Sequence, residues 1–506
     1  MRPNFILRIV YTSFLFFVIA MLMLNQGCQK KPESGEELAK LYCTGCHLLP
    51  KPNELTKELW QNKIIPKMGY IVGVKSKNWP PSVLKSFQDL PEGKLEQKKS
   101  PYLASTDALL SEEEYDEIMK YYVENAPESL DFKNPHEDLP VTALFKPKIV
   151  SLNQDLGPST TMTSFLAPGR LMVADYYSKR LIQLNEELEI RFDIPLEKAV
   201  VQFQKTENAY WATVFGDRFE GSDAPDGFMM RYSQDPAKAP TFPIVKLKRP
   251  SDAQIADVDM DGLDDWVICE FGKYTGGLSW WRNTGNGYER KELLNLPGAI
   301  NSEILDWDND GDLDIIALFG QAKEAIYFFS NNGNGTFKTI PLLEFPASYG
   351  STNLIVTDYN EDGLQDIIYS NGDLGDYTPT PKPYHGIRIF LNEGNNQLKE
   401  KLFIPVPGIY KSLFLDVDND GDCDFLSISF FPSEGQHSFV LHQNDGNNTF
   451  IPSGISNQYA SRWMVMDHMD YDEDGDQDIV LGGFQLMGDN YENKIGLLYL
   501  ENIGSR

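Results

Sequence analysis

The sequence is poor in positive charge. Its 506 residues include 45 lysines and arginines against 74 aspartates and glutamates, which gives a formal net charge of −29. Proteins that bind nucleic acids present basic grooves to the phosphates. We therefore exclude nucleic acid as a partner.

Cysteine is also scarce, with five residues in the whole chain. Small secreted domains that depend on disulfides are much richer in cysteine. Cys269 and Cys423 lie far apart in the sequence and are expected as free thiols, while the other three belong to two N-terminal motifs. The sequence therefore excludes a small disulfide-stapled fold.

Motifs of common catalytic sites are missing as well, since the chain has no GxSxG, HExxH or P-loop pattern. Four scattered histidines are expected in turns or on the surface: His385, His437, His442 and His468. The tryptophans Trp280, Trp281 and Trp307 are expected to pack inside the fold. A chain of this length exceeds one hydrophobic core and predicts two or more domains.

Long apolar runs are absent except at the N-terminus. Arg2 and Arg8 precede a mostly apolar stretch over residues 9–24, which is shorter than a membrane span. Gly27-Cys28 follows it closely. This segment resembles a bacterial lipoprotein signal, which implies a signal peptide over 1–27 and lipid on Cys28. An ordinary secretory signal or an uncleaved anchor is the alternative.

Residues 28–34 are expected as a polar tether, because lysines and then acidic residues follow Cys28. This order resembles the surface-export tags of Bacteroidota lipoproteins. It implies a protein in the cell envelope, held to the outer membrane by lipid and facing outward.

An acidic loop dominates the rest of the chain. Residues 306–314 place aspartates at positions 1, 3, 5 and 9 and a glycine at position 6. Calcium takes six to eight oxygen ligands, and glycine permits a sharp turn between them. Five copies carry these positions: Asp257, Asp259, Asp261 and Asp265; Asp306, Asp308, Asp310 and Asp314; Asp358, Asn360, Asp362 and Asp366; Asp416, Asp418, Asp420 and Asp424; Asp470, Asp472, Asp474 and Asp478.

The copies recur at intervals of 49, 52, 58 and 54 residues, each followed by short apolar runs and Asn/Gly turns. Such a period is typical of propeller blades with about four strands each. The loops resemble the FG-GAP/VCBS repeats of integrin-type propellers, which implies one Ca²⁺ per loop. Solvated acidic turns without a cation are the alternative.

About seven blades are expected. Residues 148–250 lack acidic loops but keep the rhythm of strands and turns, which indicates two degenerate blades before the five that carry loops. The last blade ends after its third strand, and Phe145–Leu152 resembles the fourth strands elsewhere. We therefore expect this segment to complete the final blade and close the ring.

Cys43-Thr-Gly-Cys46-His47 is the attachment pattern of c-type haem, with two thiols for the vinyl groups and His47 as the proximal iron ligand. A zinc site or a redox CxxC pair is the alternative. Zinc requires two further ligands nearby, and a thioredoxin-like site requires βαβ patterning; the sequence shows neither.

Helices are expected around this motif. Ser34 and Ser111 each begin a capping box, and Tyr115, Ile118 and Tyr122 follow helical spacing. Residues 35–128 resemble a small all-α, mono-haem cytochrome c domain. The resemblance implies a sixth iron ligand. Met68 is preferred, His136 from the following linker is the alternative, and Met119 is expected in the core.

The predicted organisation is therefore an N-terminal all-α haem domain, a proline-containing linker over 129–143 and an all-β propeller over 144–506. The favoured function is electron transfer to or from a redox protein partner, with the propeller used for docking. Two alternatives are a propeller dehydrogenase that passes substrate electrons to the haem, and an extracellular binding or adhesion module.

Overall fold

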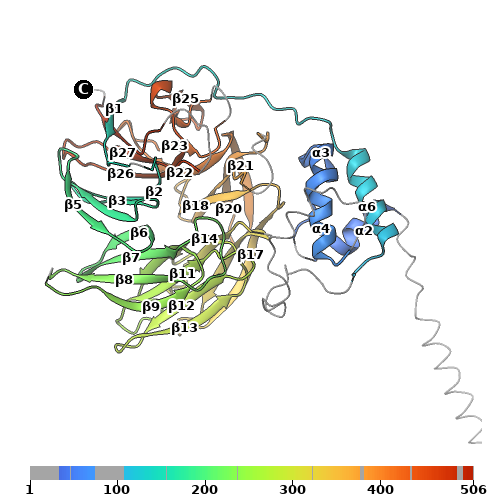
Figure 1. The fold of residues 1–506 in the computed structure, drawn as a ribbon, viewed down its shortest axis with the longest axis horizontal. Coiled ribbons are helices and arrows are strands. Elements are labelled where there is room, and N and C mark those ends of the chain that lie inside the picture. Colours follow the sequence, from blue (N-terminus) through green and yellow to red (C-terminus); the bar gives the residue numbers. More distant parts are fainter. Residues whose placement is uncertain are drawn as a thin grey trace, which may run out of the picture.

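The computed structural model describes residues 34–45, 47–74, 108–154, 156–235, 237–321, 323–375, 381–432, 436–486 and 494–504. The predicted signal peptide, Cys28 and Cys46 lie outside these residues. Within them the chain forms a helical unit followed by a β-propeller (Figure 1). None of the helices in these ranges has both the length and the hydrophobicity needed to cross a membrane.

The helical unit lies within residues 34–128. Its helices are α2 (Gly35–Cys43), the 3₁₀ turn η1 (Pro52–Glu54), α3 (Lys57–Leu59), the π-helical turn η2 (Trp60–Ile64), α4 (Ile65–Ile71) and α6 (Glu112–Asn125). Both predicted capping boxes are confirmed. The Ser111 hydroxyl accepts from the Glu114 N–H at 3.2 Å, and Ser34 and Glu37 make the same exchange at the start of α2.

The helical unit has its own hydrophobic core, in which Trp60 and Tyr122 are almost fully buried. Helices α2 and α6 cross closely at Gly35, where a Cβ atom would lie 2.1 Å from the Glu117 carbonyl oxygen. A glycine is required there because any side chain would push the two helices apart.

Seven four-stranded antiparallel sheets make up the propeller. Blades 1 and 2 are β2 (Thr160–Ala167), β3 (Arg170–Asp175), β4 (Arg180–Leu184) and β5 (Ile190–Pro195), then β6 (Ala199–Lys205), β7 (Ala209–Gly216), β8 (Gly227–Ser233) and β9 (Thr241–Leu247). Blades 3 and 4 are β10 (Pro250–Ala256), β11 (Asp265–Glu270), β12 (Gly277–Asn283) and β13 (Tyr288–Leu294), then β14 (Ala299–Leu305), β15 (Asp314–Phe319), β16 (Glu324–Asn331) and β17 (Phe337–Phe345).

Blades 5 to 7 follow the same plan. They are β18 (Ser351–Thr357), β19 (Asp366–Asn371), β20 (Gly386–Asn392) and β21 (Leu398–Pro405); β22 (Ile409–Leu415), β23 (Asp424–Ser429), β24 (Phe439–Asn444) and β25 (Phe450–Gly454), with the turn η3 (Asn457–Tyr459); and β26 (Trp463–Met469), β27 (Asp478–Gly483), β28 (Leu497–Asn502) and β1 (Phe145–Val150). The predicted seven blades are confirmed, and blades 1 and 2 are the two degenerate ones.

The predicted ring closure is confirmed too. Strand β1 pairs antiparallel with β28, from Phe145 opposite Asn502 to Val150 opposite Leu497. An N-terminal strand therefore supplies the fourth strand of the last blade. This pairing covers the edge that β28 would otherwise expose.

Burial follows the position of each strand in its blade. The second strands of blades 3 to 7 are buried throughout, as in β15, where all six residues are buried. The fourth strands, such as β13, are mainly exposed or half-buried. Trp280 and Trp307 are buried between blades, as the sequence predicts.

Polar side chains on the first strands, which line the central channel, connect each blade to its neighbour. The Thr161 hydroxyl donates to the Val200 carbonyl at 2.7 Å, and Asn301 Nδ2 donates to the Leu354 carbonyl at 3.0 Å. These polar groups are satisfied by hydrogen bonds from blade to blade. The channel lining thus helps to hold the ring together.

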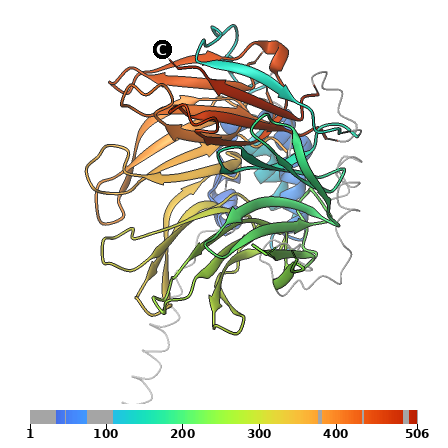
Figure 2. The ribbon, with the colours of Figure 1, turned by 90° about the vertical axis from the view of Figure 1, so that its left-hand side faces the viewer.

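The two ends of the blades carry different connections. The acidic loops join first to second strands, so in these antiparallel sheets they share one end with the Asn/Gly turns between third and fourth strands. The helical unit contacts the opposite end, where Leu48 forms an isolated bridge with Pro346. Figures 1 and 2 show this unit beside the propeller rather than within the ring.

The linker packs against blade 6. Val141 forms a bridge with Gly454, and the Gly454 N–H donates to the Pro140 carbonyl at 2.9 Å. His136 is buried there, with its ring centroid 5.2 Å from that of His442. His385, His437 and His442 are also buried. His442 lies within β24, so the prediction of a turn or surface position is wrong for it, whereas His385 and His437 lie in connections between strands.

The burial of His136 predicts a pH-dependent stability. Burial, followed by the neighbouring His437, lowers the pKa of His136 to about 4 from an ordinary 6.5. Between these pH values the unfolded chain binds a proton that the folded state excludes. The contribution of His136 to the free energy of unfolding is therefore complete above pH 6.5 and falls as the pH drops toward 4. The His136 contribution to this loss is about 3 kcal/mol.

Urea unfolding at pH 7 and pH 4.5 measures the effect. His136→Gln should lose less stability between the two pH values than the native chain, because glutamine does not titrate. His468→Gln, which changes a half-buried histidine elsewhere, should leave the native pH dependence intact. An identical pH dependence in the native chain and His136→Gln would contradict the prediction.

Candidate functional site

The five acidic loops share one backbone geometry. In each, the aspartate at position 1 accepts the N–H groups of positions 5 and 6, as Asp306 does from Asp310 at 3.1 Å and from Gly311 at 3.0 Å. The glycines at position 6 have φ between 87° and 101°, which explains the predicted glycine. The residue at position 4 also has a left-handed backbone although it is never glycine, which the sequence analysis missed. The five position 4 residues are Met260, Asn309, Glu361, Asn419 and Glu473.

The aspartate at position 9 ties its loop to the rest of the blade. The Asp314 carboxylate accepts from the Trp307 N–H at 3.0 Å and from the Asn331 N–H at 2.8 Å, and Asn331 ends the third strand. Asp366, Asp424 and Asp478 are held in the same two ways. The sequence analysis proposed position 9 as a ligand and did not foresee this structural role.

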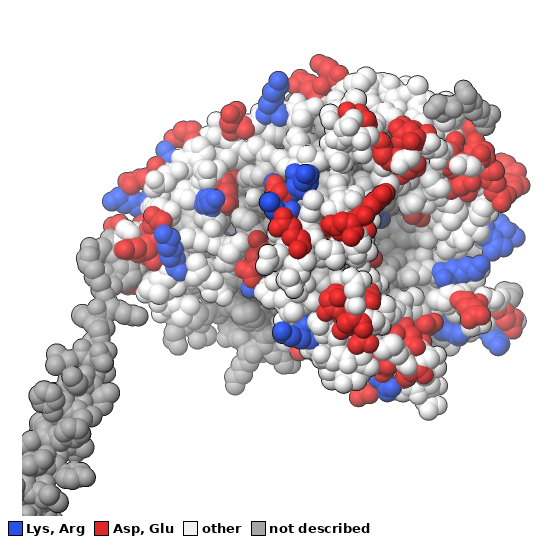
Figure 3. All heavy atoms as spheres, turned by 180° about the vertical axis from the view of Figure 1, so that it is seen from behind, with Lys and Arg blue, Asp and Glu red and all other residues white. Residues whose placement is uncertain are grey.

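Carboxylate oxygens converge in four of the five loops. In each of these, three oxygens lie within 4.8 Å of one another: Asp257, Asp259 and Asp261; Asp306, Asp308 and Asp314; Asp416, Asp418 and Asp424; Asp470, Asp472 and Asp474. The fifth loop contains Asn360, whose Nδ2 donates to Asp362 at 2.8 Å instead. Seen from behind, carboxylates gather in separate clusters over the propeller surface (Figure 3).

The electrostatics of these loops fit a hard cation. Burial, and then the nearby carboxylates, raise the pKa of Asp314 to about 6 and that of Asp424 to about 7, despite backbone hydrogen bonds that favour the charged forms. One carboxylate oxygen in each of Asp259, Asp418, Asp422 and Asp476 is buried without a hydrogen-bond partner among the described residues. Oxygens in this situation suit direct coordination by a cation such as Ca²⁺.

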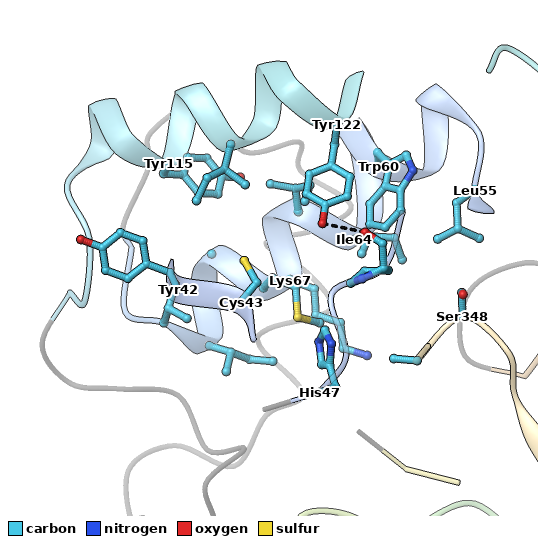
Figure 4. A pocket seen from close by; sticks show the side chains of 18 of the residues that line it. Tyr42, Cys43, His47, Leu55, Trp60, Ile64, Lys67, Tyr115, Tyr122 and Ser348 are labelled. Carbon is cyan, nitrogen blue, oxygen red and sulfur yellow. Dashed lines mark hydrogen bonds between the residues drawn. The ribbon is translucent and has the colours of Figure 1, made fainter. Parts of the chain in front are cut away.

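The haem-motif residues border a cavity in the helical unit. Cys43 at the end of α2, His47 just after it and Met68 in α4 all line this cavity. Figure 4 shows Cys43 and His47 beneath the helix that carries Tyr115 and Tyr122. Most other residues lining it from the helical unit are apolar: Leu55, Ile64, Ile65, Ile71, Val72, Leu110 and Ile118.

The His47 ring is oriented for coordination through one nitrogen. Its Nδ1 lies 2.7 Å from the Leu48 carbonyl oxygen. A carbonyl only accepts hydrogen bonds, so Nδ1 carries the proton, and in the neutral ring the lone pair is then on Nε2. This tautomer fits an iron ligand.

Two aromatic side chains hold the segment that follows the haem motif. The Tyr122 hydroxyl donates to the Pro50 carbonyl at 2.9 Å, and Trp60 Nε1 donates to the Pro52 carbonyl at 2.8 Å. Their ring centroids are 4.3 Å apart. These contacts fix one wall of the cavity.

The propeller supplies another wall, through Lys273, Tyr274, Gln321, Glu324 and Ser348. The Ser348 hydroxyl donates to Glu54 Oε2 at 2.7 Å, which joins the two units beside the cavity. Burial raises the pKa of Glu324 to about 7, although three hydrogen bonds from Gly350 and Ser351 oppose this. The sequence analysis did not foresee this wall.

The alternative iron ligand His136 does not line the cavity. It lies against His442 in blade 6, so the structure does not bring it together with His47. Met119, expected in the core, packs partly buried against the core of the helical unit. Cys269 and Cys423 are free thiols, as predicted.

A family model described as an FG-GAP-like repeat matches residues 257–317, 306–369 and 416–481, which include all five acidic loops. The propeller contains FG-GAP-like repeats. This result confirms the resemblance expected from the loops. No curated protein matches the chain in sequence.

Several solved structures are similar to this chain. BBS1N in complex with ARL6DN is 9% identical with a TM-score of 0.44, covering 72% of this chain and 98% of that one. The N-terminal domain of Nup159 is 10% identical with a TM-score of 0.42, covering 73% and 98%. Saccharomyces cerevisiae Sqt1 is 11% identical with a TM-score of 0.42, covering 68% and 84%.

Proposed function

We propose that this chain is an exported electron-transfer protein in which the helical unit holds one covalent haem c and the propeller docks a redox partner. The observation that carries the proposal is the common cavity lined by Cys43, His47 and Met68. A thiol, an imidazole and a thioether around an apolar space are the groups that attach and ligate a c-type haem.

Each residue has a defined role in this proposal. Cys43 and Cys46 would bond the haem vinyl groups, and His47 Nε2 and Met68 would hold the iron. The bound haem would supply the capacity to gain and lose one electron. The apolar lining excludes water, and the Leu48 carbonyl holds the His47 ring through Nδ1.

Calcium is proposed as the cation of the acidic loops, as expected from the FG-GAP resemblance. The converging carboxylates and their unpartnered oxygens support this assignment. Bound ions would offset the repulsion among carboxylates and stiffen the end of the propeller opposite the helical unit.

The FG-GAP propeller fits a binding or docking module. Some of its channel side chains, such as Thr161, make blade-to-blade hydrogen bonds, which supports a scaffold role over the dehydrogenase alternative. Its contacts with Glu54 also place propeller residues beside the cavity. We therefore favour docking of a redox protein near this junction.

We retain the proposal of an outer-membrane lipoprotein anchored through Cys28. Cys28→Ser should move the protein from the membrane fraction to the soluble fraction, because the thiol that carries the lipid is lost. Fractionation with mass spectrometry of the N-terminus measures this. An unmodified N-terminus at another residue would refute the anchor.

The haem assignment predicts a covalent chromophore. Protein exported from cells that mature c-type cytochromes should give a reduced α-band of that class, and the haem should resist acid–acetone extraction. Cys46→Ser should weaken or abolish attachment, and His47→Ala should disrupt the low-spin spectrum. Freely extractable haem, or zinc in its place, would refute the assignment.

Met68 and Met119 form a matched pair for the sixth ligand, because both pack against the same core but only Met68 lines the cavity. Met68→Ala should remove the methionine-to-iron charge-transfer band and lower the reduction potential. Met119→Ala should keep the band. A Met68→Ala spectrum identical to that of the native chain would exclude Met68 as a ligand.

The calcium assignment predicts that a chelator lowers the melting temperature of the propeller strongly. Binding to the folded state contributes about 2.7 kcal/mol per site at a hundredfold excess of Ca²⁺ over Kd. Far-UV circular dichroism reports the propeller and haem absorbance reports the helical unit, which should respond much less. A melting curve unaffected by chelator, with no calcium by elemental analysis, would leave the loops as solvated acidic turns.

A further inference from the structure

One residue position distinguishes the five acidic loops from one another. Each loop faces the end of the third strand of its blade, where an asparagine N–H donates to the position 9 aspartate. The residue just before this asparagine differs in every blade: Arg282, Ser330, Leu391, Gln443 and Glu501.

The side chain at this position can reach the acid at position 3 of the loop. Gln443 Nε2 donates to Asp418 Oδ2 at 2.8 Å in blade 6. In blade 7 the negative charge of Glu501 contributes to raising the pKa of Asp472. In these two blades the residue before the asparagine therefore influences the acid at position 3 of the loop.

Blade 3 is different because this residue is an arginine. Arg282 Nε contacts the Asp259 carboxylate, and Arg282 Nη2 lies 2.6 Å from Asp261 Oδ2. The guanidinium thus bridges positions 3 and 5, two of the three acids that converge in this loop. The Asp259 side chain is only 9% exposed, whereas that of Arg282 is 31% exposed, so the ion pair is shielded from water mainly on its acidic side.

A guanidinium in this place competes with a metal ion. It uses oxygens that a cation would need, and it adds a positive charge beside the site. Arginine also stays protonated at any physiological pH, so the competition is not relieved by titration. The carboxylates of this loop are already neutralised in part by the protein's own cation.

We propose that Arg282 replaces calcium in the loop of blade 3, so that residues 257–265 hold their fold without a metal ion. This inference rests on the proposed calcium function of the other loops. In this proposal the loop of blade 3 holds no ion, although its sequence keeps all four aspartates that the pattern requires. The positive charge that pairs with Asp259 and Asp261 comes instead from Arg282, 23 and 21 residues later in the chain.

The test is the number of calcium ions bound per chain, measured on the full protein by elemental analysis after equilibrium dialysis. Arg282→Ser, which gives blade 3 the residue found in blade 4, should bind one more ion than the native chain. Its melting temperature should fall without calcium and recover with it. The control Lys291→Ser removes a positive charge from β13 of the same blade and should leave the count unchanged.

The reciprocal variant protects the test against a folding defect. Ser330→Arg places a guanidinium beside the loop at 306–314 and should bind one ion fewer than the native chain. Unchanged counts in both arginine-swap variants, with calcium bound to the native chain, would overturn the role of Arg282. No calcium in the native chain or in any variant would instead overturn the proposed calcium function, and with it this inference.

Discussion

The antiparallel pairing of β1 with β28 closes the ring, and the positions of the other parts depend on it. It joins residues more than 340 positions apart, and the ion pair of Lys146 with Glu501 at 2.9 Å lies within it. Because β1 is fixed in blade 7, the linker before it must run over blade 6. The helical unit is thereby held at the propeller, beside blades 4 and 5.

Within the ring, blades 3 to 7 repeat one local device. The position 1 aspartate stabilises the turn and the position 9 aspartate joins the loop to the third strand. In four of these loops three carboxylates also converge. A positive charge nearby would relieve the repulsion among those acids. The blades differ in the side chains that surround the converging acids. In blade 3 the positive charge beside them comes from Arg282.

The junction of the two units links the candidate haem cavity to the propeller. Glu54 from the helical unit meets Ser348 and Tyr384 from the propeller, and Glu324 lies buried at the same cavity. A cavity with walls from both units has its polarity set by both. Docking on the propeller and electron transfer in the helical unit are therefore physically adjacent in the proposed function.

The sequence by itself determined the parts that depend on local or periodic patterns. The capping boxes at Ser34 and Ser111, the acidic loops, the number of blades and the closing strand all follow from short motifs and a repeat near fifty residues. Such features are decided by hydrogen bonds and burial within one blade or one helical turn.

Tertiary structure alone decided which distant residues meet. The burial of His136 against His442, the propeller wall of the cavity and the contact of Arg282 with Asp259 all join side chains from different elements. A periodic pattern predicts that a loop exists but does not show which neighbouring side chain reaches it. The charge and accessibility of each site are therefore set by packing between elements.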